Sequence, residues 1–308
     1  MKILRSMLSV VLGLAMVAAA SAADYNGDQV IASGETVTWP ATEWVTIGAW
    51  GPDGSLTVQG ELSGMGYLML NRGGNANTEA FLIVDGGLVS GGNLYANHGS
   101  TGGIGGVTVQ NGGTLNMTGF ANIGNGAGLA TFTQTGGTTS IADIFYLART
   151  ANWSCTASIS GGSFTVGGLD MDEVGTARFD VFGSEATIDV TGALVSKAAS
   201  TFGFSVVDGS LSTINAGSAG TLAGTIDMAL LGATPAAASV FNLITVGSGT
   251  VALDNLVLSA EDQADWTLQL SGDGMSVQAV YAVPEPATMG LLGMGLVGLV
   301  ARRRARKA

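Results

Sequence analysis

The chain has 308 residues, with 49 glycines, 11 basic and 23 acidic side chains, and a formal net charge of −12. Between residues 23 and 282, four basic residues stand against 22 acidic ones, and this net charge of −18 opposes binding to nucleic acid and to anionic polysaccharide. The single cysteine, Cys155, excludes an intramolecular disulfide, and the glycines follow no collagen-like period.

Residues 1–22 have the composition of a secretory signal peptide. Lys2 and Arg5 form a positive start, residues 7–20 are apolar or small, and Ala20 and Ala22 make an A-x-A cleavage site. The apolar run is shorter than a membrane-spanning helix. We expect export through the Sec machinery with cleavage after Ala22; an uncleaved N-terminal anchor is the alternative.

Residues 41–215 contain a repeat in which alternating apolar residues lead into a glycine turn. The copies include Leu82-Ile83-Val84-Asp85-Gly86 and Val107-Thr108-Val109 before Gly112. A short extended segment, such as residues 67–70 or 144–147, forms the second half of each unit. The turn glycines are 22 to 26 residues apart, which is a strong repeat signal. They are Gly60, Gly86, Gly112, Gly136, Gly161, Gly183 and Gly209.

This period predicts an all-β fold, a parallel β-helix of about seven coils. Three short strands fill one coil of about 25 residues, and each coil adds about 4.8 Å along the axis. Alternate residues such as Val107, Ile159, Phe164 and Phe179 should point inward, and glycine at the turns supplies positive φ. The pattern resembles the strand repeats of bacterial autotransporter passenger domains. An antiparallel β-sandwich or prism is the alternative fold.

A β-helix exposes strand edges at both ends, and these edges need protection. Residues 23–40 precede the first clear coil and are predicted to form an N-terminal cap. The period ends after about Ile214, and longer apolar strands follow, for example residues 241–246 and 275–281. We predict that residues 216–282 form a C-terminal β cap with antiparallel pairs.

Residues 283–308 have three parts in a fixed order. Val283-Pro284-Glu285-Pro286 is a stiff extended break, residues 287–301 are apolar, and a basic tail follows with Arg302, Arg303, Arg304, Arg306 and Lys307. This order resembles the PEP-CTERM sorting tail of exported proteins of Gram-negative bacteria. The resemblance implies that exosortase, a membrane protease, processes the chain near Pro284-Glu285-Pro286.

The apolar run of residues 287–301 is predicted to be a short transmembrane helix. It would span about 22 Å, less than the roughly 30 Å of the bilayer core, which favours a transient anchor. The basic tail should remain in the cytoplasm and hold the body of the protein outside.

Few side chains suit catalysis or metal binding. His98 is the only histidine, which excludes a multi-histidine metal site; we expect a solvated loop residue there and an inert, packed thiol at Cys155. Asp170, Asp172 and Glu173 form a weak candidate Ca²⁺ site or glycosidase pair, and solvated surface charge is the expectation. Trp44, Trp50, Tyr146 and Trp153 are candidates for stacking on sugars.

These observations predict a non-enzymatic structural or adhesion protein of the cell surface or extracellular matrix, sorted through its tail. Its expected surroundings are an exopolysaccharide matrix or biofilm, with no cofactor and no nucleic acid partner. A polysaccharide-binding or polysaccharide-degrading β-helix enzyme is the alternative. A groove that gathers two carboxylates beside an aromatic ring would favour the enzyme.

Overall fold

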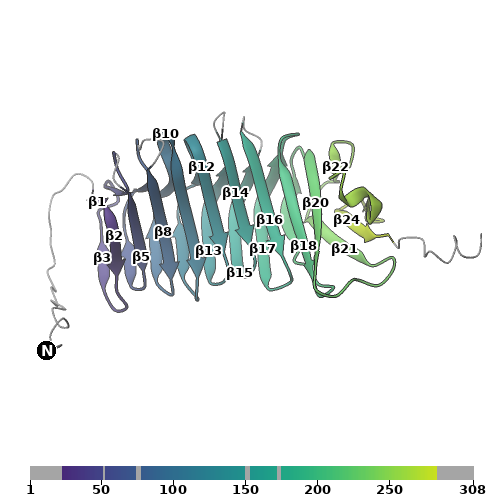
Figure 1. Ribbon diagram of the computed structural model, residues 1–308, viewed down its shortest axis with the longest axis horizontal. Helices are drawn as coiled ribbons and strands as arrows, with labels where there is room; N and C mark the ends of the chain where they lie inside the picture. The colour runs from purple at the N-terminus through teal and green to yellow at the C-terminus, as the bar shows by residue number, and fades with distance from the viewer. Residues whose placement is uncertain (1–22, 51–52, 74–77, 150–152, 172–174, 283–308) are drawn as a thin grey trace, which may run out of the picture.

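The computed structural model describes residues 23–50, 53–73, 78–149, 153–171 and 175–282. Within these ranges the regular structure is β, apart from one short 3-10 turn, η1 (Asp262–Ala264). The chain forms a β-solenoid of about eight turns, and Figure 1 shows the strands stacked side by side along one long axis. The predicted all-β parallel β-helix is confirmed, because almost all strand pairs are parallel.

Each turn contributes strands to three faces. Face 1 contains β2 (Gly27–Ile31), β5 (Gly54–Val58), β8 (Glu79–Asp85), β14 (Trp153–Ile159), β16 (Thr176–Phe182), β18 (Thr201–Val207), β20 (Gly224–Leu231) and β22 (Leu256–Leu258). Face 2 contains β3 (Thr36–Thr38), β6 (Glu61–Ser63), β9 (Leu88–Gly91), β11 (Thr114–Met117) and the paired part of β21 (Val240–Val246). Face 3 begins with β1 (Ala23–Tyr25), β4 (Trp44–Ile47) and β7 (Tyr67–Leu70).

Longer strands bend around a corner and belong to two faces. β10 (Asn93–Gln110) and β12 (Ala121–Gln134) run from face 3 to face 1. β13 (Thr138–Leu147), β15 (Gly162–Met171), β17 (Ala186–Ser196) and β19 (Ile214–Ala219) run from face 2 to face 3. Several of their registers shift at the bend, which is how one strand serves two faces.

The core is a column of inward side chains stacked turn upon turn. Phe132, Phe145, Phe164 and Phe179 are fully buried, and their rings meet edge to face with centroids 5.2–5.8 Å apart. Each such side chain contributes about 1.5–3 kcal/mol by burial, and the edge-to-face contacts add to this. The inward positions predicted from the repeat are therefore correct.

The ends of the repeat region differ from the prediction. Residues 23–40 do not form a separate cap, because β1, β2 and β3 pair in parallel with β4, β5 and β6 and so make the first turn. Within the described part of the chain, strands of the second turn cover one side of the first turn, and residues 27–30 of β2 are exposed. The sequence of this turn is polar and lacks the apolar alternation from which the other repeats were predicted.

At the other end, the parallel ladders continue past residue 215. β18 pairs with β20, β19 with β21, and β20 with β22, all in parallel. Antiparallel pairing begins only with β24 (Ser276–Tyr281), which lies between β21 and β23 (Trp266–Leu270). The predicted boundary of the solenoid at residue 215 is therefore too early. The connections between strands become longer after β20, so the sequence no longer repeats at the same spacing.

A row of left-handed residues forms the corner at the end of face 3. Asn71 and Asn97 have φ of 51° and 66°, and Gly48, Gly124 and Ala148 have φ of 64°, 97° and 57° in the neighbouring turns. The Asn71 amide nitrogen donates to Asn97 Oδ1 at 2.8 Å, and both side chains are fully buried. Asparagine is favoured here because it tolerates this conformation and its amide nitrogen can donate to backbone and side-chain oxygens of the corner.

The turn glycines have a conformation that differs in part from the prediction. Gly136 and Gly161 lie in consecutive turns, since a Cβ built on Gly161 would be 3.8 Å from the Gly136 Cα. Neither has positive φ; the left-handed residues are the next ones, Gly137 and Gly162, at 74° and 77°. A Cβ on Gly162 would also collide with the carbonyl oxygen of Gly137.

This difference yields a matched pair of variants. Gly162→Ala should lower the free energy of unfolding by about 1–3 kcal/mol, because alanine would be held at positive φ against a backbone oxygen. Gly136→Ala should change it by less than about 0.5 kcal/mol, because its new Cβ would approach only the Asn111 nitrogen, at 3.9 Å. Denaturant unfolding measures both. Equal losses in the two variants would contradict the assigned turn geometry.

Candidate functional site

Five aromatic side chains point outward from face 3 and follow one another along the rod. We call them the aromatic strip: Trp44 of β4, Tyr67 of β7, Tyr95 of β10, Phe120 directly before β12, and Tyr146 of β13. Their neighbouring ring centroids are 5.3–6.5 Å apart, close to one turn of the solenoid. The strip therefore repeats with the backbone.

The strip consists of two adjacent outward rows. Trp44 pairs with Tyr67 in the first row, which Phe120 continues. Tyr95 and Tyr146 belong to the second row, and Asn122 is the in-register partner of both. The strand alternation places all of them outside, because their neighbours in sequence, such as Ala121 and Ile123, fill the core.

Asn122 is fully buried between the two tyrosines although it occupies an outward position. Neither its Oδ1 nor its Nδ2 has a hydrogen-bond partner. A buried amide in this state is unfavourable by about 1–3 kcal/mol relative to a satisfied one. This side chain is the clearest unsatisfied polar group on the strip.

Two of the four basic residues of the body lie on the strip. The Arg72 guanidinium carbon lies 4.3 Å from the Trp44 ring centroid and 5.7 Å from that of Trp50, and Arg149 lies 4.7 Å from that of Tyr146. All three contacts are cation–π interactions. The salt bridges of Arg178 involve neither strip arginine, and Arg72 and Arg149 contact aromatic rings.

His98 also belongs to this region and is not the solvated loop residue that we expected. It lies within β10 and is half buried, with its ring edge-on to Tyr95 at 4.7 Å. Burial lowers the His98 pKa, and the charge of Arg72 lowers it further. Burial likewise raises the pKa of Tyr95, while Arg149 opposes that rise.

The structure brings together part of the predicted sugar-binding set. Trp44 and Tyr146 stand at the two ends of the strip, and Trp50 is 68% exposed beside Arg72. The side chain of Trp153 is outside the described part. Tyr67, Tyr95 and Phe120 were missed, although the five aromatics recur every 23–28 residues, in the second half of each repeat.

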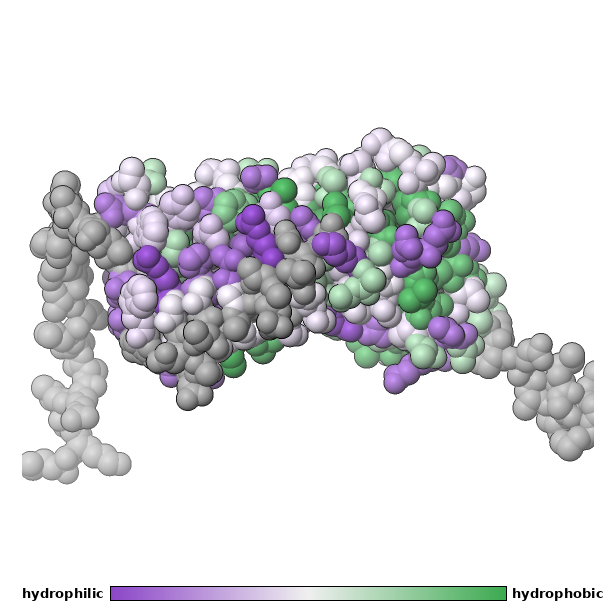
Figure 2. Space-filling model, turned by 90° about the horizontal axis from the view of Figure 1, so that it is seen from above, coloured by the Kyte–Doolittle hydropathy of each residue, from purple (hydrophilic) through white to green (hydrophobic). Residues whose placement is uncertain are grey.

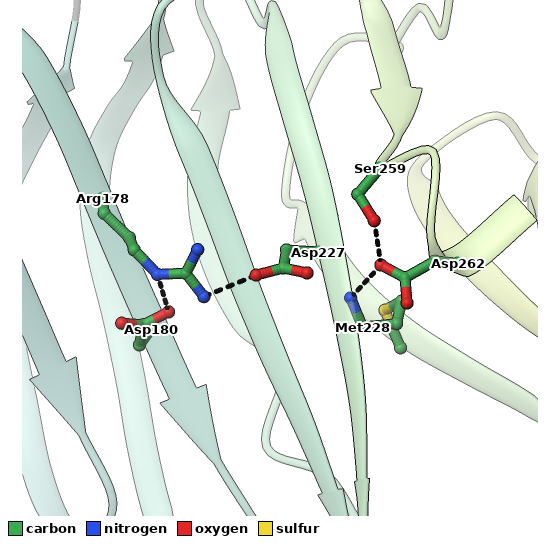
Figure 3. Close-up of polar contacts among 6 residues, drawn as sticks. All are labelled: Arg178, Asp180, Asp227, Met228, Ser259 and Asp262. Atoms are coloured by element: carbon green, nitrogen blue, oxygen red, sulfur yellow. Dashed lines mark hydrogen bonds and ion pairs between the residues drawn. The ribbon is translucent and has the colours of Figure 1, made fainter.

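A second cluster of charged residues, Arg178, Asp180 and Asp227, is held together by salt bridges. Arg178 Nε donates to Asp180 at 2.7 Å, and its Nη2 donates to Asp227 at 2.7 Å, crossing above Gly203 where a Cβ would collide (Figure 3). Burial raises the pKa of Asp180, and Arg178 opposes that rise. This cluster ties β16 to β20 across β18.

Asp262 protects a strand edge near the C-terminal end. Its carboxylate accepts from the Met228 N–H at 2.8 Å and from Ser259 Oγ at 2.5 Å (Figure 3). β22 pairs with β20 only as far as Ile226, so Asp262 supplies the acceptor that the next exposed N–H of β20 requires.

The described residues assemble little that resembles a catalytic or metal centre. Cys155 is buried, and burial raises its pKa to about 12, so the thiol stays protonated. No group of three or more His, Cys, Asp or Glu side chains lies together within the described ranges. Asp170 pairs with Tyr146 in register, but Asp172 and Glu173 of the predicted Ca²⁺ site fall outside the description.

The predicted signal peptide, with Ala20 and Ala22, and the predicted tail, with its motif, apolar run and basic residues, also lie outside the described residues. No helix in the described part of the chain is long and apolar enough to cross a membrane.

Comparison with known protein families supplies the deciding observation on the tail. Residues 282–305 match the model of the PEP-CTERM protein-sorting motif. The chain carries a PEP-CTERM sorting tail. The motif belongs to exported proteins that are anchored in the membrane before exosortase processes them. No curated protein and no solved structure matches the chain.

The electrostatics of the strip predict a test on the single histidine. Its imidazole should titrate below 6.5, and stability should fall as the pH drops below that value, because the folded state disfavours the protonated form. Arg72→Gln should raise the His98 pKa toward 6.5, whereas Arg149→Gln, at the far end of the strip, should leave it unchanged. NMR titration measures each value. A wild-type pKa of 6.5 or more would contradict the geometry.

Proposed function

We propose that this PEP-CTERM protein is a non-enzymatic structural or adhesion rod of the cell surface or extracellular matrix. The single observation that carries the proposal is the sorting motif joined directly to a solenoid: the match begins at residue 282, and the last strand, β24, ends at Tyr281. A sorted solenoid suits a protein that presents an extended surface outside the cell.

The junction between rod and tail supports an anchoring role. β24 lies between β21 and β23 and pairs with both, so the strand that leads into the motif is hydrogen-bonded on two sides. The Trp266 ring packs against Tyr281 at 5.1 Å and against Phe241 at 5.8 Å. A force applied to the tail is therefore transmitted to a hydrogen-bonded β-sheet whose aromatic side chains pack together.

A non-enzymatic role is supported by the chemistry of the described residues. The Cys155 thiol is buried and protonated, His98 packs against Tyr95, and Asp180 and Asp227 are both engaged by Arg178. Each of these groups is engaged by other parts of the protein, whereas a catalytic group would have to contact a substrate. We propose no hydrolytic or lyase activity for this rod.

The experiment is mass spectrometry of the mature protein from the producing bacterium. Surface and medium fractions should contain a chain that starts at Ala23 and lacks Arg302–Lys307, while the membrane fraction retains the tail. A variant that ends at Ala282 serves as the control: it should fold but never appear as the tailed membrane precursor. Intact Arg302–Lys307 on the bulk of the surface protein would contradict processing of the tail.

A further inference from the structure

We propose that the aromatic strip of face 3 binds an uncharged polysaccharide along the axis of the rod. The inference rests on the proposed function, because it names the ligand class that an extracellular rod of this kind would hold. The residues that carry it are Trp44, Tyr67, Tyr95, Phe120 and Tyr146, with Asn122 between Tyr95 and Tyr146.

The geometry matches a polymer of repeating rings. The five aromatic side chains advance once per turn of the solenoid, with centroids 5.3–6.5 Å apart, and all five are partly exposed. An extended glycan likewise presents one ring per unit, with an apolar C–H face that packs on an aromatic surface. A row of aromatics thus offers successive weak contacts to one chain, which add up by multivalency.

The polar groups of the strip match sugar hydroxyls. Asn122 is fully buried and both atoms of its amide lack partners. If the side chains that cover Asn122 move apart, a hydroxyl that enters between Tyr95 and Tyr146 would both donate to Oδ1 and accept from Nδ2. Arg72 and Arg149 lie over rings near the two ends of the strip and add donors beside them.

The charge of the body selects an uncharged polymer. Residues 23–282 carry a net charge of −18, which repels an acidic polysaccharide at long range. The guanidinium groups of Arg72 and Arg149 are stacked on rings, so they are already partly engaged. Stacking and hydrogen bonding to hydroxyls, which depend little on ionic strength, remain as the forces for binding.

The test is affinity gel electrophoresis of the full-length chain, kept soluble in a mild nonionic detergent. The gels contain hydroxyethyl cellulose, glucomannan or galactomannan as uncharged probes, and alginate as the acidic probe. At least one uncharged polymer should retard the protein, with an affinity unchanged between low and high salt. Phe120→Ala should weaken this binding about tenfold.

Two further variants separate binding from folding. Phe81→Ala removes an outward ring from face 1, where it lies over Gly106, and should bind as the parent does. Asn122→Leu should keep the melting temperature or raise it, because it removes an unsatisfied amide, and should still weaken binding several-fold. If Asn122 had a structural role alone, Asn122→Leu would not weaken polysaccharide binding while the melting temperature is kept.

Three results would overturn the inference. They are no retardation by any uncharged polymer, equal losses in Phe81→Ala and Phe120→Ala, or salt-sensitive binding to alginate alone, which would assign an acidic polysaccharide. Each of these can occur in a protein that is correctly sorted and processed, so failure of the strip is distinguishable from failure of the proposed function.

Discussion

The in-register parallel stacking of one turn upon the next is the constraint on which the structure depends. Along the parallel ladders, inward residues lie in register with inward residues of the neighbouring turn, so the core of the solenoid is a column. The same register aligns the left-handed corner of Asn71 and Asn97 and the aromatic strip outside. A residue type that recurs at the turn period becomes a row, whether it serves the core, the corner or the surface.

The sequence predicts those features that recur with the period. Alternation and turn glycines indicated the parallel β-helix, and Phe164 and Phe179 were placed correctly in its core. Features that depend on one turn alone were missed. The first turn was assigned to a cap because its exposed strand β2 lacks the apolar alternation. Positive φ was assigned to Gly136 and Gly161 instead of Gly137 and Gly162, since two adjacent glycines do not reveal which one turns the chain.

In the candidate site, too, the sequence predicts some residues, whereas others depend on how the turns stack. Trp44 and Tyr146 were identified as surface aromatics from their type, but their connection through Tyr67, Tyr95 and Phe120 depends on the register of three intervening turns. The buried, unpartnered state of Asn122 is a property of packing that no pattern predicts. The sorting tail, by contrast, was predicted from sequence and confirmed by its family match, because a linear motif needs no tertiary structure to be recognised.

Removal of two whole turns tests the stacking model most directly. Residues 113–161 can be deleted so that Gly112 is joined to Gly162. Gly162 then takes the place of Gly113, because Thr114 pairs with Thr138 and Thr138 with Ser163. Small-angle X-ray scattering should show a folded rod that is shorter by about 10 Å at an unchanged cross-section, because each turn adds one strand spacing. An unfolded chain, or a rod that narrows without becoming shorter, would contradict the model.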